Sequence, residues 1–179
     1  NEASIKKLIA RAKRRGVITV DELNEALPQD QMSADQIEDI GVKAKTIGLT
    51  TDQLQELSYA ARQADVSAEE LNTSLSFFAK GFGQAQAGVG PLVEGLKKID
   101  PELAKALKGA RNMQEALFIV ADAMDSLTST TDKAAVSTAV FGRSGIGNLR
   151  LFGEGSAKLR EAAAAARDRA ADGAGIPRR

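Results

Sequence analysis

The chain has 179 residues, enough for one domain or two small ones, and its 24 basic residues balance its 24 acidic residues. A neutral chain has no overall field that would draw it to nucleic acid or to a membrane surface. Cysteine and histidine are both absent, which excludes disulfides, thiolate chemistry, imidazole ligands and the familiar catalytic triads. Aromatic residues make up only 4%, so we expect a modest aliphatic core, and no apolar run is long enough to span a bilayer.

Residues 1–45 are predicted to form a compact three-helix unit, because apolar residues recur there at helical spacing. The expected helices are Ser4–Arg15, Val20–Ala26 and Ala34–Lys45. Gly16 follows the basic end of the first helix and is a C-terminal cap signal. Thr19 and Ser33 each open a capping box, and Pro28 breaks the chain between the second and third helices.

Charge is sharply divided within this unit. Residues 1–16 carry six basic side chains and one acidic side chain, whereas residues 17–40 carry seven acidic side chains and no basic one. A solvated helical face is the usual interpretation of such a charge run.

A second interpretation comes from a resemblance. The segment SIKKLIARAKRRGVITVDELNEALPQDQMSADQIEDI resembles region 1.1 of bacterial primary sigma factors, particularly the alphaproteobacterial kind. The resemblance implies a small helical domain with an acidic surface, which sits in the DNA channel of RNA polymerase and keeps the free sigma factor from promoters. Core RNA polymerase would then be the partner. The acidic face implied for it comprises Asp21, Glu22, Glu25, Asp35, Glu38 and Asp39.

The resemblance to region 1.1 is expected to end at Ile40. The sigma regions that read promoter DNA are missing, so direct sequence-specific DNA binding is not expected. A join near Gly41 would be a natural fusion, an engineered chimera or a composed sequence. The chain begins at Asn1 without a methionine, which suggests a fragment or a processed product.

Residues 46–82 are predicted to form an αα-hairpin of two amphipathic helices. Its apolar face comprises Leu54, Leu57, Ala61 and Ala64 in the first helix and Leu71, Leu75, Phe78 and Phe82 in the second. Capping boxes begin at Thr50 and Ser67, and an apolar residue precedes each of them, Leu49 and Val66, as in a hydrophobic staple.

Shorter helices are expected beyond the hairpin, over Leu92–Lys98, Pro101–Lys108, Met113–Leu127 and Asp132–Val140. Asp100 and Asn112 are their clearest N-caps. Four glycines between positions 81 and 90 predict a flexible hinge. The Ala-rich segment 156–179 is predicted to be a helix that buries little area, exposed or coiled, followed by a frayed tail.

The glycine-rich segment FGRSGIG (Phe141–Gly147) has two interpretations. Its glycines, with Arg143 and Ser144, could hold an anion through backbone N–H groups. We favour a tight turn that lets Phe141 and Ile146 pack, because the phosphate-binding consensus is missing.

Two segments resemble parts of phage tail tape measure proteins. They are IGLTTDQLQELSYAARQADVSAEELNTSL and the FGRSG that follows an Ala-rich helix. This resemblance covers residues 42–152. It implies a structural, non-catalytic role in tail length and assembly, with tail proteins as partners or self-association through apolar helix faces. The location implied is the bacterial cytoplasm during assembly and then the virion tail.

The sequence therefore predicts an all-α chain, a small N-terminal three-helix unit followed by helical hairpins, partly elongated. The expected domains are 1–45, 46–155 and 156–179. The function expected first is a tape measure scaffold. The alternatives are a region 1.1-like module that binds RNA polymerase, or an engineered chimera of the two. No catalytic residue, cofactor or metal is expected, since carboxylate pairs such as Glu69-Glu70 lie on polar helix faces.

Overall fold

The computed structural model describes residues 6, 9–10, 13–14, 16 and 34–173, and these contain nine α-helices and no strand. The predicted all-α class is confirmed for this part of the chain. The chain divides into two compact units, Asn1–Lys43 and Ala44–Arg179. Helix α3 (Ala34–Ile47) corresponds to the third predicted helix and contains the boundary. The first two predicted helices lie outside the described residues, apart from a few helical positions in the first.

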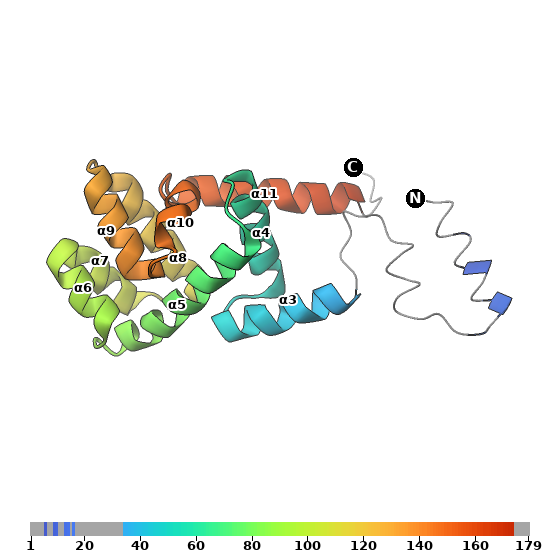
Figure 1. Cartoon of the computed structure of the whole chain (residues 1–179), viewed down its shortest axis with the longest axis horizontal. Coiled ribbons are helices and arrows are strands. Elements are labelled where there is room, and N and C mark those ends of the chain that lie inside the picture. Colours follow the sequence, from blue (N-terminus) through green and yellow to red (C-terminus); the bar gives the residue numbers. More distant parts are fainter. Residues whose placement is uncertain (1–5, 7–8, 11–12, 15, 17–33, 174–179) are drawn as a thin grey trace. The chain divides into compact units, whose positions relative to one another are not determined.

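The second unit consists of short helices packed around α5. Its elements are α4 (Thr51–Gln63), α5 (Ala68–Gln86), α6 (Pro91–Ile99), α7 (Pro101–Gly109), α8 (Met113–Ser126), α9 (Thr130–Phe141), α10 (Gly145–Phe152) and α11 (Ser156–Gly173). Helices α4 and α5 form the predicted hairpin, and α5 also contacts α6 to α10. Helix α11 runs along α4, which is its most extensive contact (Figure 1).

Local capping explains where most of these helices begin. In each case a side-chain oxygen accepts a hydrogen bond from the backbone N–H three residues later, at Thr50, Ser67, Asp100, Asn112 and Ser129. At Thr50 the reciprocal bond from its own N–H to Gln53 is also present, which completes the predicted capping box. Only the cap at Ser129 was not expected, and it starts α9 two residues earlier than predicted.

The turn between α4 and α5 is tight and uses a residue other than glycine. Asp65 has a φ of 56°, and the N–H of Val66 donates to the carbonyl of Ala61 at 2.8 Å, which closes the end of α4. On the α5 side Leu71 is fully buried. Leu57, predicted to share the buried face of α4, is only half-buried because it borders a groove next to α11.

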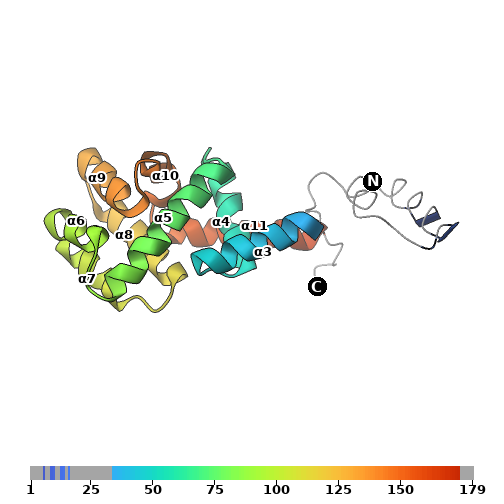
Figure 2. The ribbon, with the colours of Figure 1, turned by 60° about the horizontal axis from the view of Figure 1, so that its bottom comes forward.

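The core of the second unit contains a row of phenylalanines from three helices, in which Phe78 meets Phe141 edge to face and Phe141 stacks on Phe152. The rings of Phe78 and Phe141 lie 5.7 Å apart between centroids, and those of Phe141 and Phe152 lie 4.8 Å apart. All three side chains are at most 1% exposed. Helix α5 accordingly lies beside α9 and α10 in both views (Figure 2). These ring contacts hold α5, α9 and α10 together.

The predicted glycine hinge is wrong in its first half. Gly81 and Gly83 lie within α5, which continues to Gln86 because Phe82 and Ala85 still face the core. Only the last two glycines leave the helix. Gly88 and Gly90 have φ values of 75° and 99°, and they make a hydrogen-bonded turn into α6.

Candidate functional site

The predicted acidic face is described only in part. Asp21, Glu22 and Glu25 lie outside the described residues. Asp35 falls within α3, but its side chain lies outside the described part.

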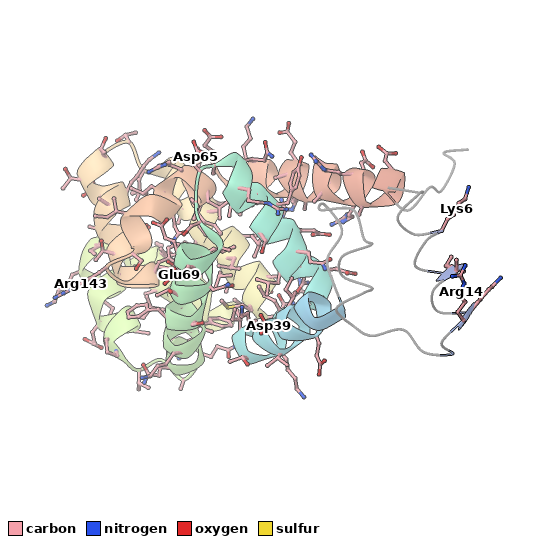
Figure 3. All side chains as sticks on the ribbon, turned by 45° about the vertical axis from the view of Figure 1, so that its right-hand side comes forward. Lys6, Arg14, Asp39, Asp65, Glu69 and Arg143 are labelled. Atoms are coloured by element: carbon pink, nitrogen blue, oxygen red, sulfur yellow. The ribbon has the colours of Figure 1, made fainter. Side chains whose placement is uncertain are left out.

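The two remaining acids of that face, Glu38 and Asp39, are exposed on α3. Figure 3 labels Asp39 on this helix. Asp39 forms an ion pair with Lys43, one turn later, with 2.9 Å between Oδ2 and Nζ. The two side chains are 62% and 47% exposed, so water screens this pair and it contributes at most about 1 kcal/mol. A partner with a basic surface could therefore replace Lys43 at little cost.

A second candidate site is a groove in the second unit between α4, α8 and α11. Its cavity has a volume of about 20 Å³, which is room for about one water molecule. Its apolar wall is formed by Leu49, Leu57, Leu117, Phe118, Leu159 and Ala163. The polar rim includes Glu56, Gln53 and Gln114, and the last two side chains are joined by a hydrogen bond of 2.9 Å.

Helix α11 is fixed at its start by α8. The carboxylate of Asp122 accepts hydrogen bonds from the N–H of Ser156 at 2.7 Å and from its hydroxyl at 2.9 Å. An N-terminal cap normally comes from the preceding residue, but here α8 supplies it. One turn further on, the guanidinium of Arg160 lies 4.6 Å from the centroid of the Phe118 ring, a cation–π contact.

A bidentate ion pair fixes the middle of α11 to α4. Arg167 donates from Nε to Oε1 of Glu56 at 2.5 Å and from its second nitrogen to Oε2 at 3.3 Å. The Glu56 side chain is only 12% exposed, and its hydrogen bond raises the pKa of Arg167 above the usual value for arginine. The apolar contribution of α11 is small, because Leu159 is its only buried large side chain and alanines supply the rest of that face.

The glycine turn between α9 and α10 is explained by packing. Gly145 lies so close to the backbone of Ser137 that a Cβ there would overlap the Ser137 carbonyl oxygen. In return the Ser137 hydroxyl donates to the carbonyl of Gly145. Arg143 is exposed and points away from the helices (Figure 3), and Ser144 makes no cap to α10. Packing contacts alone therefore explain this turn, as the tight-turn interpretation predicts.

Two details of that turn differ from the prediction. Phe141 is buried as expected, but Ile146 is 61% exposed. The segment beginning at Gly145 is also helical, because Asn148, Leu151 and Phe152 place a buried face one turn later.

A buried polar contact between α5 and α10 could not be found from the sequence. Asn148 donates from Nδ2 to the hydroxyl of Ser74 at 2.5 Å, and neither residue is exposed. The two are 74 positions apart, so no local pattern connects them. Within the described chain, Oδ1 of Asn148 is the one buried side-chain polar atom without a hydrogen-bond partner.

Two further properties bear on function. No group of three or more acidic, histidine or cysteine side chains in the described ranges is placed to hold a metal ion. The helices that the structure describes also include none with the length and apolar run needed to cross a membrane.

A protein-family model matches the N-terminal part of the chain. The model of sigma-70 factor, region 1.1, matches residues 1–74, which is less than half of the 179-residue chain. This supports the resemblance for the N-terminal segment. The match also continues beyond Ile40, where we expected it to end, through α4 and into α5. No solved structure matches the chain.

The matching family is that of sigma factors rather than tape measure proteins, so the resemblance of residues 42–152 to tail proteins gains no support and stays a prediction.

Proposed function

We propose that the N-terminal segment is a region 1.1-like regulatory module that binds core RNA polymerase through its acidic face. The match of residues 1–74 to sigma-70 region 1.1 is the observation that carries this proposal. The acidic block between residues 17 and 40 gives the match a physical meaning, because it carries seven negative charges and no positive one. A surface of this sign complements a channel built to hold the phosphates of DNA.

The proposed mechanism is electrostatic competition. Glu38 and Asp39 present two carboxylates on consecutive positions of α3, both accessible to a partner. Exposed charges interact over about 8–10 Å at physiological ionic strength, so the contact weakens as salt is added. Binding at low salt without promoter recognition is therefore expected, because the chain has no array of aromatic and basic residues suited to melted DNA.

A binding titration tests this role. Labelled full-length chain is titrated with purified bacterial core RNA polymerase at low and high salt, alongside the double variant Glu38→Lys/Asp39→Lys. The matched control is Glu154→Lys/Asp168→Lys, which changes the net charge equally at exposed positions of the second unit. Reversing two exposed charges is expected to weaken binding about tenfold, and the control pair should change it little. Absence of binding at low salt, or equal losses in both double variants, would contradict the proposal.

We also propose that the chain is not an enzyme. The carboxylates with described partners have structural roles: Asp100 and Asp122 cap helices, and Glu56 pairs with Arg167. An unbiased screen of hydrolase and transferase substrates that returned turnover above background would overturn this part.

The tail role of residues 42–152 is a second proposal. It is supported by the resemblance described above and by the scaffold character of α4 and α5, whose polar ends serve as caps. Mass spectrometry of purified virions tests it. Peptides from residues 42–152 in intact tails are the expected result, and their consistent absence would leave only the module that binds polymerase.

A further inference from the structure

One phenylalanine of α5 lies on the surface of the second unit. Phe77 is 52% exposed, whereas Phe78 and Phe82 on the same helix are buried. The ring of Phe77 lies against Gly142, where an added Cβ would be 3.3 Å from two of the ring carbons. An aromatic ring that is exposed and already held against the backbone is a suitable anchor for a partner, because it loses little freedom when it is covered.

The exposed face of α5 carries opposite charges at its two ends. Glu69 (Figure 3) and Lys80 are eleven positions apart, which is about three helical turns. Both side chains therefore lie on the same side of the helix, about 16 Å apart along its axis. Between them this face carries Thr73, Ser76 and Phe77, which are all exposed.

The two charges are not used inside the chain. Neither Glu69 nor Lys80 has an ion-pair partner in the part of the chain that the structure describes. The side chains of Thr73 and Ser76 between them are small, so another helix can approach this face closely.

This face is complementary to itself. When two copies of α5 pack antiparallel, a two-fold axis between Thr73 and Ser76 places Glu69 of each copy opposite Lys80 of the other. The same axis places the ring of Phe77 against Thr73 of the second copy. A parallel arrangement would instead bring like charges together, so the charge pattern selects the antiparallel one.

We propose that the exposed face of α5 is a self-association surface, through which two copies of this chain pair antiparallel. One helix from each copy buries less area than a standard interface, so we expect a weak dimer with a dissociation constant of about 10–100 μM. The surface uses none of the residues proposed to bind polymerase, and it goes beyond that function.

The first experiment tests the aromatic anchor. Sedimentation velocity of the full-length chain over about three decades of concentration, centred on the expected dissociation constant, should show a shift from monomer to dimer. Phe77→Ser should abolish the shift. The matched control is Val89→Ser, which replaces a side chain that is 57% exposed outside this face and should leave the dimer unchanged. A parent chain that stays monomeric at every concentration, or equal losses in the two variants, would overturn the proposal.

The second experiment tests the pairing of charges. Glu69→Lys has two cations on the face and Lys80→Glu has two anions, so each variant should dimerise at least tenfold more weakly than the parent chain. An equimolar mixture of the two variants should form a heterodimer. The double variant Glu69→Lys/Lys80→Glu should recover self-association, because opposite charges face each other again.

Matched controls assign the effect to α5. Glu102→Lys and Lys105→Glu reverse exposed charges on α7, the first of them also in the first turn of its helix, and should leave the dimer unchanged. Far-UV circular dichroism checks that each variant remains folded. A parent chain that dimerises while the mixture and the double variant fail to associate would refute antiparallel pairing through α5.

Discussion

Leu57 and Leu71 both belong to the predicted apolar face of the hairpin, yet their environments differ. Leu71 is completely buried, whereas Leu57 is half-buried at the groove next to α11. A stripe of leucines shows which face of a helix turns inward, but it does not show which turn of that face meets a well-filled core. Burial depends on residues from α8 and α11 that are distant in the sequence.

We expect Leu71→Ala to lower the free energy of unfolding by about 2–5 kcal/mol, the range for a fully buried leucine. Leu57→Ala should cost less, about 1 kcal/mol, because part of its side chain is already in contact with solvent. Urea denaturation followed by circular dichroism measures both. Equal losses would mean that Leu57 is as tightly packed as Leu71.

A single carboxylate links stability to pH. The carboxylate of Glu115 accepts hydrogen bonds from the backbone N–H of Arg111 at 2.7 Å and from its guanidinium at 3.1 Å, and these bonds lower the pKa of Glu115. The unfolded chain, with a glutamate pKa of about 4.3, therefore takes up the proton more readily. The stabilisation is present above that pH and is lost as the pH falls through the lower pKa of the folded state.

Glu115→Gln should accordingly destabilise the chain at pH 7 and have a diminishing effect as the pH is lowered below about 4. Denaturation midpoints measured across this range check the trend. Arg111→Gln should have a smaller effect, because the backbone N–H of residue 111 still donates. A loss for Glu115→Gln that is constant with pH would exclude the linkage.

At the scale of the helices, replacing two different glycines by alanine is expected to have opposite effects on the stability of the chain. Gly83 lies inside α5, and a Cβ there would meet nothing within 4 Å. Gly145 starts α10 directly against the carbonyl of Ser137. Gly83→Ala should therefore stabilise the chain by about 0.5–1 kcal/mol through helix propensity. Gly145→Ala should destabilise it by about 1–3 kcal/mol, because the backbones of α9 and α10 must separate.

Both values can be read from urea denaturation curves with unchanged slopes. If Gly145→Ala were neutral, the close approach of α9 and α10 would not be part of the folded state.

Helix boundaries could be predicted well where the determinant is local. The caps at Thr50, Ser67, Asp100 and Asn112 each involve a residue three positions away, and the sequence displays that spacing directly. The glycines at the start of α10 predict a turn, whereas the helix and its buried face begin there.

The candidate sites also differ in whether their determinants are local in the sequence. The acidic block of residues 17–40 is visible in the sequence as composition. The groove is not, because the pair between Glu56 and Arg167 joins residues 111 positions apart. The Ala-rich α11 was expected to bury little, and it does, but its position along α4 depends on that pair and on Asp122.

At the scale of the whole molecule, the described apolar core lies entirely between Ala44 and Leu159. A unit with its own core can fold alone. We therefore expect residues 44–179, expressed without the first unit, to keep a cooperative thermal transition within about 4 °C of the one in the full chain. Calorimetry measures it. A broad, non-cooperative transition would show that the second unit needs residues 1–43.

The row of phenylalanines also has a consequence for how the chain is made. The hairpin of α4 and α5 can close as soon as both helices have left the ribosome, because its contacts are local. Phe78, however, finds Phe141 and Phe152 only when α9 and α10 have been synthesised. Until then α5 presents an aromatic surface to the cell, which is a period of exposure to aggregation and to chaperones. Ribosome-bound chains that end before Phe141 should therefore recruit chaperones more than chains that extend past Phe152.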